Sequence, residues 1–177
     1  MATLRVPVTS RDHFDGDLDA PAVLLEYGDY ECPYCRLAHP IVKRVQQHFG
    51  DQLCFVYRHF PMTEVHPNAG PAAEAAEFAD AHGRFWPMHD LLFETQPLNV
   101  PVLFVLIGSL GLSQVELRDA LAKGTYAKKV QNDFVGGVRS GVNGTPSFFI
   151  NSRRHDRSYA FPELVAAIND QLAHVHA

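Results

Sequence analysis

Glu26-Tyr27-Gly28-Asp29-Tyr30-Glu31-Cys32-Pro33-Tyr34-Cys35 is the stretch that decides how this chain is expected to fold. The apolar run that leads into it, residues 22–27, predicts a buried parallel strand. Apolar residues then recur at helical spacing up to residue 49, which predicts a helix. Pro33 suits its first turn, because backbone N–H groups there have no partner within the helix and the N–H that proline lacks is not needed. Two thiols two residues apart, at the point where a strand passes into a helix, are typical of a redox site.

Composition limits the class of protein. The 177 residues suggest one domain, or one domain with a sizeable insertion, and 46% apolar residues suffice for an ordinary core. The net charge is −5 and no run of five basic residues occurs, so a nucleic-acid partner is not expected. Three cysteines are too few for a disulfide scaffold, which favours a working thiol pair.

Membrane and export signals are not evident in the sequence. Residues 1–19 are polar and acidic and contain no apolar segment of the kind found in a signal peptide. The longest apolar stretch, residues 98–112, is interrupted by Pro101, Gly108 and Ser109, so we expect a core helix and no membrane contact. We therefore expect a cytoplasmic protein, or a periplasmic one if a leader precedes Met1.

The order of predicted elements is β-α-β, then helices, then β-β-α. After a polar lead-in, strands are expected at residues 22–27 and 53–57, joined by a helix that Pro40 should kink. A hairpin beginning at residues 147–150 should supply antiparallel edge strands, and a helix over 161–173 closes the chain. Between the two halves, helices are expected at 67–82, 84–93, 100–110, 113–122 and 126–140, the fourth starting with a capping box from Ser113 to Glu116.

The two thiols of the pair should differ in acidity. Cys32 stands where the helix begins, and unpaired N–H groups and the helix dipole favour a thiolate there. We therefore expect Cys32 to be the nucleophile that forms a mixed disulfide, and Cys35, one turn further on, to be the less exposed thiol that resolves it.

Two other interpretations of the cysteine pair remain open. A CxxC is also half of a zinc site, but the chain has no second CxxC or CxxH, and His39 leaves a fourth ligand missing. The pair could also be an inert structural disulfide, for which a chain of this size has little need. We expect no metal.

A second motif, Gly144-Thr145-Pro146-Ser147-Phe148-Phe149-Ile150, adds a resemblance. With the segment around the cysteines, it resembles the DsbA-like branch of the thioredoxin superfamily, over nearly the whole chain. The resemblance implies an α/β thioredoxin fold with a helical insertion between the second and third core strands. It places the core in residues 1–60 and 141–177 and the inserted helical subdomain in residues 61–140.

The resemblance also implies residue roles. Cys32 and Cys35 match the redox pair, and Glu26 matches a buried carboxylate that relays a proton to or from Cys35. Pro146 matches the cis-proline beside the active-site disulfide, and Thr145 matches the residue whose backbone pairs with an extended substrate. The residues between the cysteines, Pro33 and Tyr34, complete the expected substrate-binding set.

Three functions are consistent with these residues. The first is a thiol–disulfide oxidoreductase that acts on protein disulfides or thiols, with a cellular reductant or oxidant as partner and no bound cofactor. The second is a glutathione-dependent reductase or transferase, because Pro33-Tyr34 resembles the glutaredoxin dipeptide and glutathione would then be a co-substrate. The third is a peptide-binding module with little turnover. The sequence leaves the direction of electron flow and the oligomeric state open.

Other reactive residues are assigned to packing. Cys54 lies within an apolar strand and is expected to be a passive core thiol. His59 and His66 are expected to pack or cap where the chain leaves the sheet. The aromatic residues around Trp86 recur at helical spacing, which predicts a core-facing helix.

Overall fold

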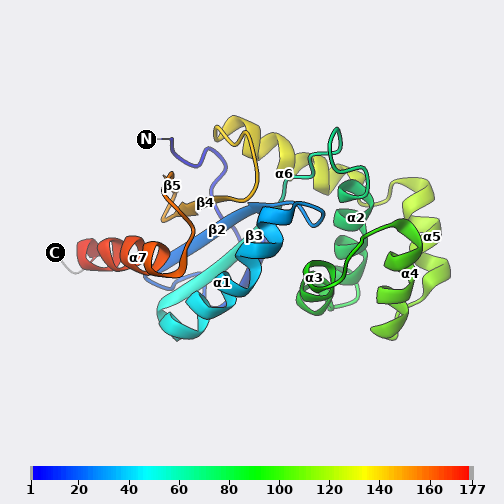
Figure 1. Ribbon diagram of the computed structural model, residues 1–177, viewed down its shortest axis with the longest axis horizontal. Coiled ribbons are helices and arrows are strands. Elements are labelled where there is room, and N and C mark those ends of the chain that lie inside the picture. The colour runs from blue at the N-terminus through cyan, green and yellow to red at the C-terminus, as the bar shows by residue number, and fades with distance from the viewer. Residues whose placement is uncertain (1, 176–177) are drawn as a thin grey trace.

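A five-stranded mixed sheet forms the centre of the molecule, whose computed structural model describes residues 2–175 (Figure 1). The sheet order is β1-β3-β2-β4-β5. Strands β2 (Ala22–Gly28) and β3 (Leu53–His59) are parallel, and β1 (His13–Asp15), β4 (Ser147–Ile150) and β5 (Arg153–His155) each run antiparallel to their neighbour. This is the mixed sheet of the thioredoxin fold.

Helices cover the sheet and extend beyond one end of it. The helix α1 (Pro33–Phe49), followed by a short 3₁₀ turn (Gly50–Gln52), connects β2 to β3, and α7 (Phe161–Val175) ends the described chain. Five helices separate β3 from β4, as expected for a helical insertion: α2 (Ala69–Asp80), α3 (Phe85–Glu94), α4 (Val100–Ser109), α5 (Gln114–Lys123) and α6 (Ala127–Arg139). Figure 1 shows α2–α5 grouped beyond the end of the sheet where α1 begins.

Alternation along β2 and β3 divides the core into two layers. Leu24 and Phe55 belong to the larger layer, with residues of α1, α7 and the inserted helices. Leu25 and Val56 belong to the second layer, where Phe134 of α6 packs. Both faces of these strands are therefore buried, which explains why their sequences are almost uninterruptedly apolar. Among the described residues, no helix is both long and apolar enough to span a bilayer.

Two expectations about the sheet were wrong. No strand was expected before residue 22, but residues 13–15 form β1, which pairs with the outer edge of β3. The last hairpin was expected to supply edge strands, but β4 lies between β2 and β5, so β5 is the one edge strand of that hairpin and β1 forms the other edge of the sheet. The division into a core and an inserted subdomain at residues 61 and 140 stays a prediction.

Candidate active site

The cysteine pair lies at the N-terminus of α1. Cys32 is the N-cap residue with extended backbone, and Pro33 begins the helix, as the sequence predicted. Both thiols are free and buried, Cys35 completely and Cys32 to within 4% exposure. Pro33 and Tyr34 between them are exposed, and Tyr34 presents 61% of its surface to solvent. Of the two thiols, only that of Cys32 therefore reaches the surface, next to the exposed Pro33 and Tyr34.

The two thiols differ strongly in acidity. The pKa of Cys32 is lowered from 9.0 to about 5, chiefly because the Cys35 thiol hydrogen-bonds to it. Burial opposes this shift, whereas hydrogen bonds from Thr145 and from the backbone N–H groups of Tyr34 and Cys35 add to it. The pKa of Cys35 is raised well above 9.0, first by burial and then by its hydrogen bond to Cys32 and by the charge of Glu26. At neutral pH Cys32 is therefore the thiolate and Cys35 the thiol.

Thr145 and Pro146 approach Cys32 from the segment that precedes β4. The Thr145–Pro146 peptide bond is cis. The Cys32 Sγ lies 3.4 Å from the Thr145 carbonyl oxygen, within hydrogen-bonding distance. Both residues are partly exposed, so they lie beside the thiol and remain open to solvent. The structure thus brings together the two motifs that the sequence separates by more than a hundred residues.

Glu26 is a buried carboxylate in β2. The residue is 2% exposed, and within residues 2–175 its Oε1 has no hydrogen-bond partner. Burial, with a smaller contribution from the charge of Cys32, raises its pKa from 4.5 to about 8. Because the charge of Glu26 in turn raises the pKa of Cys35, the carboxyl group and the thiol interact electrostatically. This is the placement that the resemblance implied.

Asp29 organises the loop before Cys32, a role that the sequence analysis missed. Its Oδ1 accepts hydrogen bonds from the backbone N–H groups of Glu31 (2.8 Å) and Cys32 (3.1 Å). Its Oδ2 accepts from the N–H of Met62 at 2.9 Å and lies 2.8 Å from His66 Nδ1. One indication of this role is present in the sequence, namely that an acidic residue stands between a buried strand and Cys32.

The segment after β3 forms the other wall of the site. The sulfur of Met62 lies 3.8 Å from the Thr145 hydroxyl, so this segment reaches Thr145 as well as Asp29. Burial alone would lower the pKa of His66, but the hydrogen bond to Asp29 and the negative charges of Asp29 and Cys32 outweigh it and raise the pKa. His66, assigned to packing from the sequence, is therefore near enough to the thiolate to interact with it. Three side chains around this region are unusually exposed for apolar residues, namely Tyr34, Leu37 and Val65.

The remaining candidates lie away from the site. Cys54 is fully buried in β3, and burial raises its pKa to about 11, which matches a passive core thiol. His39 is buried on α1 with its Nε2 3.4 Å from Asp90. In α3, Phe85, Met88, Leu92 and Phe93 are core residues, and Trp86 and Leu91 pack against them.

Comparison with known proteins agrees with this geometry. A family model described as thioredoxin matches residues 9–170. The chain therefore belongs to the thioredoxin family. The crystal structure of oxidised BdbD from Bacillus subtilis is 25% identical, with a TM-score of 0.86, and the match covers 97% of this chain and 98% of that one. The structure of Wolbachia pipientis alpha-DsbA1 shares the fold, with a TM-score of 0.82 at 19% identity over 97% of this chain and 95% of that one. Within the family, the chain shares its fold with these BdbD and alpha-DsbA1 structures over nearly its whole length.

A closer match in sequence comes from longer proteins. A protein of Salinispora arenicola named Na(+)/H(+) antiporter NhaA 1 is 44% identical over 172 residues, which cover 96% of this chain and 26% of that protein. The chain spans about a quarter of the length of the curated relatives it matches. Their name therefore describes proteins most of whose length has no counterpart here.

Proposed function

We propose that this protein exchanges its Cys32–Cys35 dithiol or disulfide with the thiols or disulfides of other proteins. The observation that carries the proposal is that the pKa values of the two thiols are shifted in opposite directions. The pKa of Cys32 is lowered to about 5, and that of Cys35 is raised well above 9.0. A thiolate attacks disulfides whereas a thiol does not, so one member of the pair is ready to react and the other is held in reserve.

In the reducing direction, the Cys32 thiolate attacks one sulfur of a substrate disulfide. A bond forms between Cys32 and that sulfur, the substrate S–S bond breaks, and the other substrate sulfur leaves as a thiolate. Cys35 then loses its proton and attacks Cys32, which closes the Cys32–Cys35 disulfide and releases the second substrate thiolate. The substrate gains two electrons and the protein loses two, and oxidation of a substrate is the reverse sequence. The exchange requires no cofactor.

Glu26 is the group that we assign to the proton of Cys35. While Cys32 is a thiolate, its charge helps to hold the pKa of Glu26 at about 8. Formation of the mixed disulfide removes that charge, so the pKa of Glu26 falls and its carboxylate becomes more populated at neutral pH. Glu26 therefore becomes available as a base at the step in which Cys35 must be deprotonated.

The surroundings of Cys32 favour a polypeptide substrate. We propose that the backbone of Thr145, with Pro146, pairs with an extended substrate segment next to the Cys32 thiolate. Tyr34 and Leu37 of the same helix, exposed at 61% and 62%, add apolar surface, as at other protein-binding sites. With Pro33 they would contact the residues that flank the substrate cysteine.

The test is a trapping experiment with the Cys35→Ser variant. This variant keeps the nucleophile and lacks the resolving thiol, so it should accumulate mixed disulfides with substrate proteins that a reductant releases. The matched control is Cys54→Ser, whose buried thiol should leave turnover unchanged. Turnover on a protein disulfide should exceed turnover on a glutathionylated peptide. The proposal fails if Cys35→Ser traps no adduct, and a preference for the glutathionylated peptide would assign the glutathione-dependent reaction instead.

A further inference from the structure

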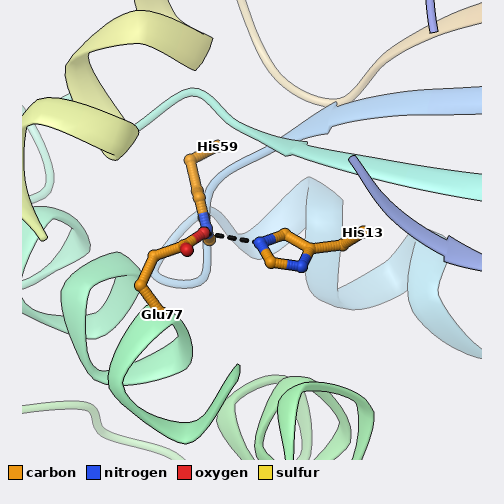
Figure 2. A group of neighbouring side chains, drawn as sticks. All are labelled: His13, His59 and Glu77. Atoms are coloured by element: carbon orange, nitrogen blue, oxygen red, sulfur yellow. Dashed lines mark hydrogen bonds and ion pairs between the residues drawn. The ribbon is translucent and has the colours of Figure 1, made fainter. Parts of the chain in front are cut away.

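A second group of reactive side chains lies outside the cysteine site. His13 of β1, His59 at the end of β3 and Glu77 of α2 meet between the sheet and the inserted helices (Figure 2). Glu77 Oε1 lies 2.6 Å from His13 Nε2 and 2.7 Å from His59 Nε2. All three side chains are at least nine-tenths buried. The reaction proposed above uses none of them.

We propose that His13, His59 and Glu77 form a binding site for a divalent transition metal ion of the zinc class. Two imidazole nitrogens and one carboxylate oxygen are a ligand set that such ions prefer. The three atoms come from three separate elements and lie close together, and each imidazole can coordinate through the lone pair of Nε2 as the neutral tautomer that carries its proton on Nδ1.

The present spacing is that of hydrogen bonds and must open when the ion enters. Bonds of about 2.0–2.2 Å in a tetrahedral arrangement place ligand atoms about 3.3 Å apart. Each Nε2 must therefore move away from Glu77 Oε1 by several tenths of an ångström. His13 stacks flat on Phe85, with ring centroids 3.6 Å apart and an interplanar angle of 8°, so its ring can slide within its plane and keep that contact.

Asp80 gives His13 the second contact that is usual for a metal-bound imidazole. Its Oδ1 lies 3.4 Å from His13 Nδ1, on the side of the ring opposite to Glu77. Ligating histidines commonly turn their other N–H to a carboxylate, which fixes the ring and strengthens the ligand. Asp80 is about half exposed, and a surface cavity of about 280 Å³ is lined by His13, Asp80, Phe85 and Trp86 among others. This cavity provides an entry route with a negative charge at its wall.

A metal-free arrangement competes with this site. In it, His13 and His59 are hydrogen-bonded to Glu77 through their Nε2 atoms, and His13 Nδ1 lies 3.4 Å from Asp80. His59 Nδ1 has no hydrogen-bond partner in the part of the chain that the structure describes, so this atom does not distinguish the two states. The experiment must therefore separate a metal site from a purely hydrogen-bonded clamp.

A similar group at His39, His89 and Asp90 is the less suitable candidate. There the Nζ of Lys43 lies 2.9 Å from Asp90 Oδ1 and 3.0 Å from Oδ2, so an ammonium group already neutralises the carboxylate. His89 Nδ1 is also engaged with the Tyr30 hydroxyl at 2.9 Å. Among the described residues, Glu77 has no ammonium partner, and neither His13 nor His59 is hydrogen-bonded to a hydroxyl group.

The consequence of binding would be structural. The ligands come from the sheet and from α2, so one ion would fix the inserted helices to the sheet. His59 pairs in register with Gly28, four residues before Cys32, and its ring lies 6.0 Å from that of Tyr30. The ion would thus sit behind the loop that carries the nucleophile without reaching it.

The test measures zinc binding to the full chain in its oxidised form, in which Cys32 and Cys35 are joined and offer no thiolate ligands. Protein stripped with a chelator should take up one equivalent of Zn²⁺, and its thermal unfolding should move to higher temperature. Co²⁺ should bind with a visible spectrum of nitrogen and oxygen ligands and no thiolate band. His59→Gln and Glu77→Gln should lose the binding.

Asp80→Asn is the deciding variant, because its half-exposed side chain can change without disturbing the core. It should bind Zn²⁺ about 10- to 100-fold more weakly than the native chain. The matched control is Glu116→Gln, an exposed carboxylate 3.8 Å from His82, which should bind as the native chain does. The proposal is overturned if the native chain retains no zinc, or if Asp80→Asn and Glu77→Gln bind as tightly as it does. The hydrogen-bonded clamp is then the whole role of the group, and the cysteine chemistry is unaffected.

Discussion

Glu26→Gln should change how the stability of the reduced protein depends on pH. Glu26 is buried in β2 with a pKa of about 8, against an ordinary value of 4.5 for the unfolded chain. Between these values the folded protein holds a proton that the unfolded chain has released. Folding therefore takes up a proton, and the free energy of unfolding falls as the pH rises. Glutamine has no such proton, so the variant lacks this fall.

The size of the effect follows from the two pKa values. From pH 5.5 to pH 7.5, a carboxyl with a pKa near 8 when folded and 4.5 when unfolded costs about 2.5 kcal/mol of stability. Cys32 acts in the opposite sense, because its pKa is lowered and its thiolate stabilises the folded state as the pH rises. Both proteins contain Cys32, so its contribution cancels in the difference between them.

The measurement is urea unfolding of both proteins with excess reductant at several pH values in this range. The free energy of unfolding of Glu26→Gln minus that of the native chain should increase by about 2.5 kcal/mol from pH 5.5 to pH 7.5. Glu64→Gln, at an exposed position, is the matched control and should give a constant difference. Parallel curves for Glu26→Gln and the native chain would refute a carboxyl group with a strongly raised pKa at this position.

Three further predictions concern the cysteine loop. The rate of alkylation of Cys32 should reach half its maximum near pH 5, and Cys35→Ala should move that midpoint upward, because the Cys35 hydrogen bond is the largest cause of the lowered pKa. Asp29→Ala should destabilise the protein by about 3 kcal/mol or more in urea unfolding, since three buried or partly buried backbone N–H groups lose their acceptor. Gly28→Ala should cost about 1–3 kcal/mol, because its Cβ would lie 2.5 Å from the Tyr57 ring, and an unchanged unfolding midpoint would contradict that packing.

The features that the sequence predicted well are those decided by neighbouring residues. The strands β2 and β3 are buried on both faces, so their apolar runs mark them without ambiguity. The sequence also placed Cys32 at the start of a helix and Cys35 one turn inside it, because Pro33 marks that boundary. The main causes of their different pKa values, the hydrogen bond between the thiols and the burial of Cys35, depend on the folded structure. Strand β1 could not be seen this way, because three residues carry too little pattern. It forms where the outer edge of β3 offers hydrogen bonds to an adjacent segment.

The polar contacts between distant segments could not be predicted from neighbouring residues, although the sequence indicated that one partner of each would need such a contact. Glu77 lies within α2 among buried alanines, and a charge at such a position requires a buried partner. The sequence offered several histidines as partners and no means of choosing between them, because His13 and Glu77 are 64 residues apart. Asp29 and His66 are likewise joined across 37 residues. Both contacts depend on how the chain continues after β3. The segment between β3 and α2, which contains His66, lies against the cysteine loop, and α2, which contains Glu77, lies against the sheet. A change in how the insertion packs would therefore reach both the nucleophile and the His13–Glu77–His59 group.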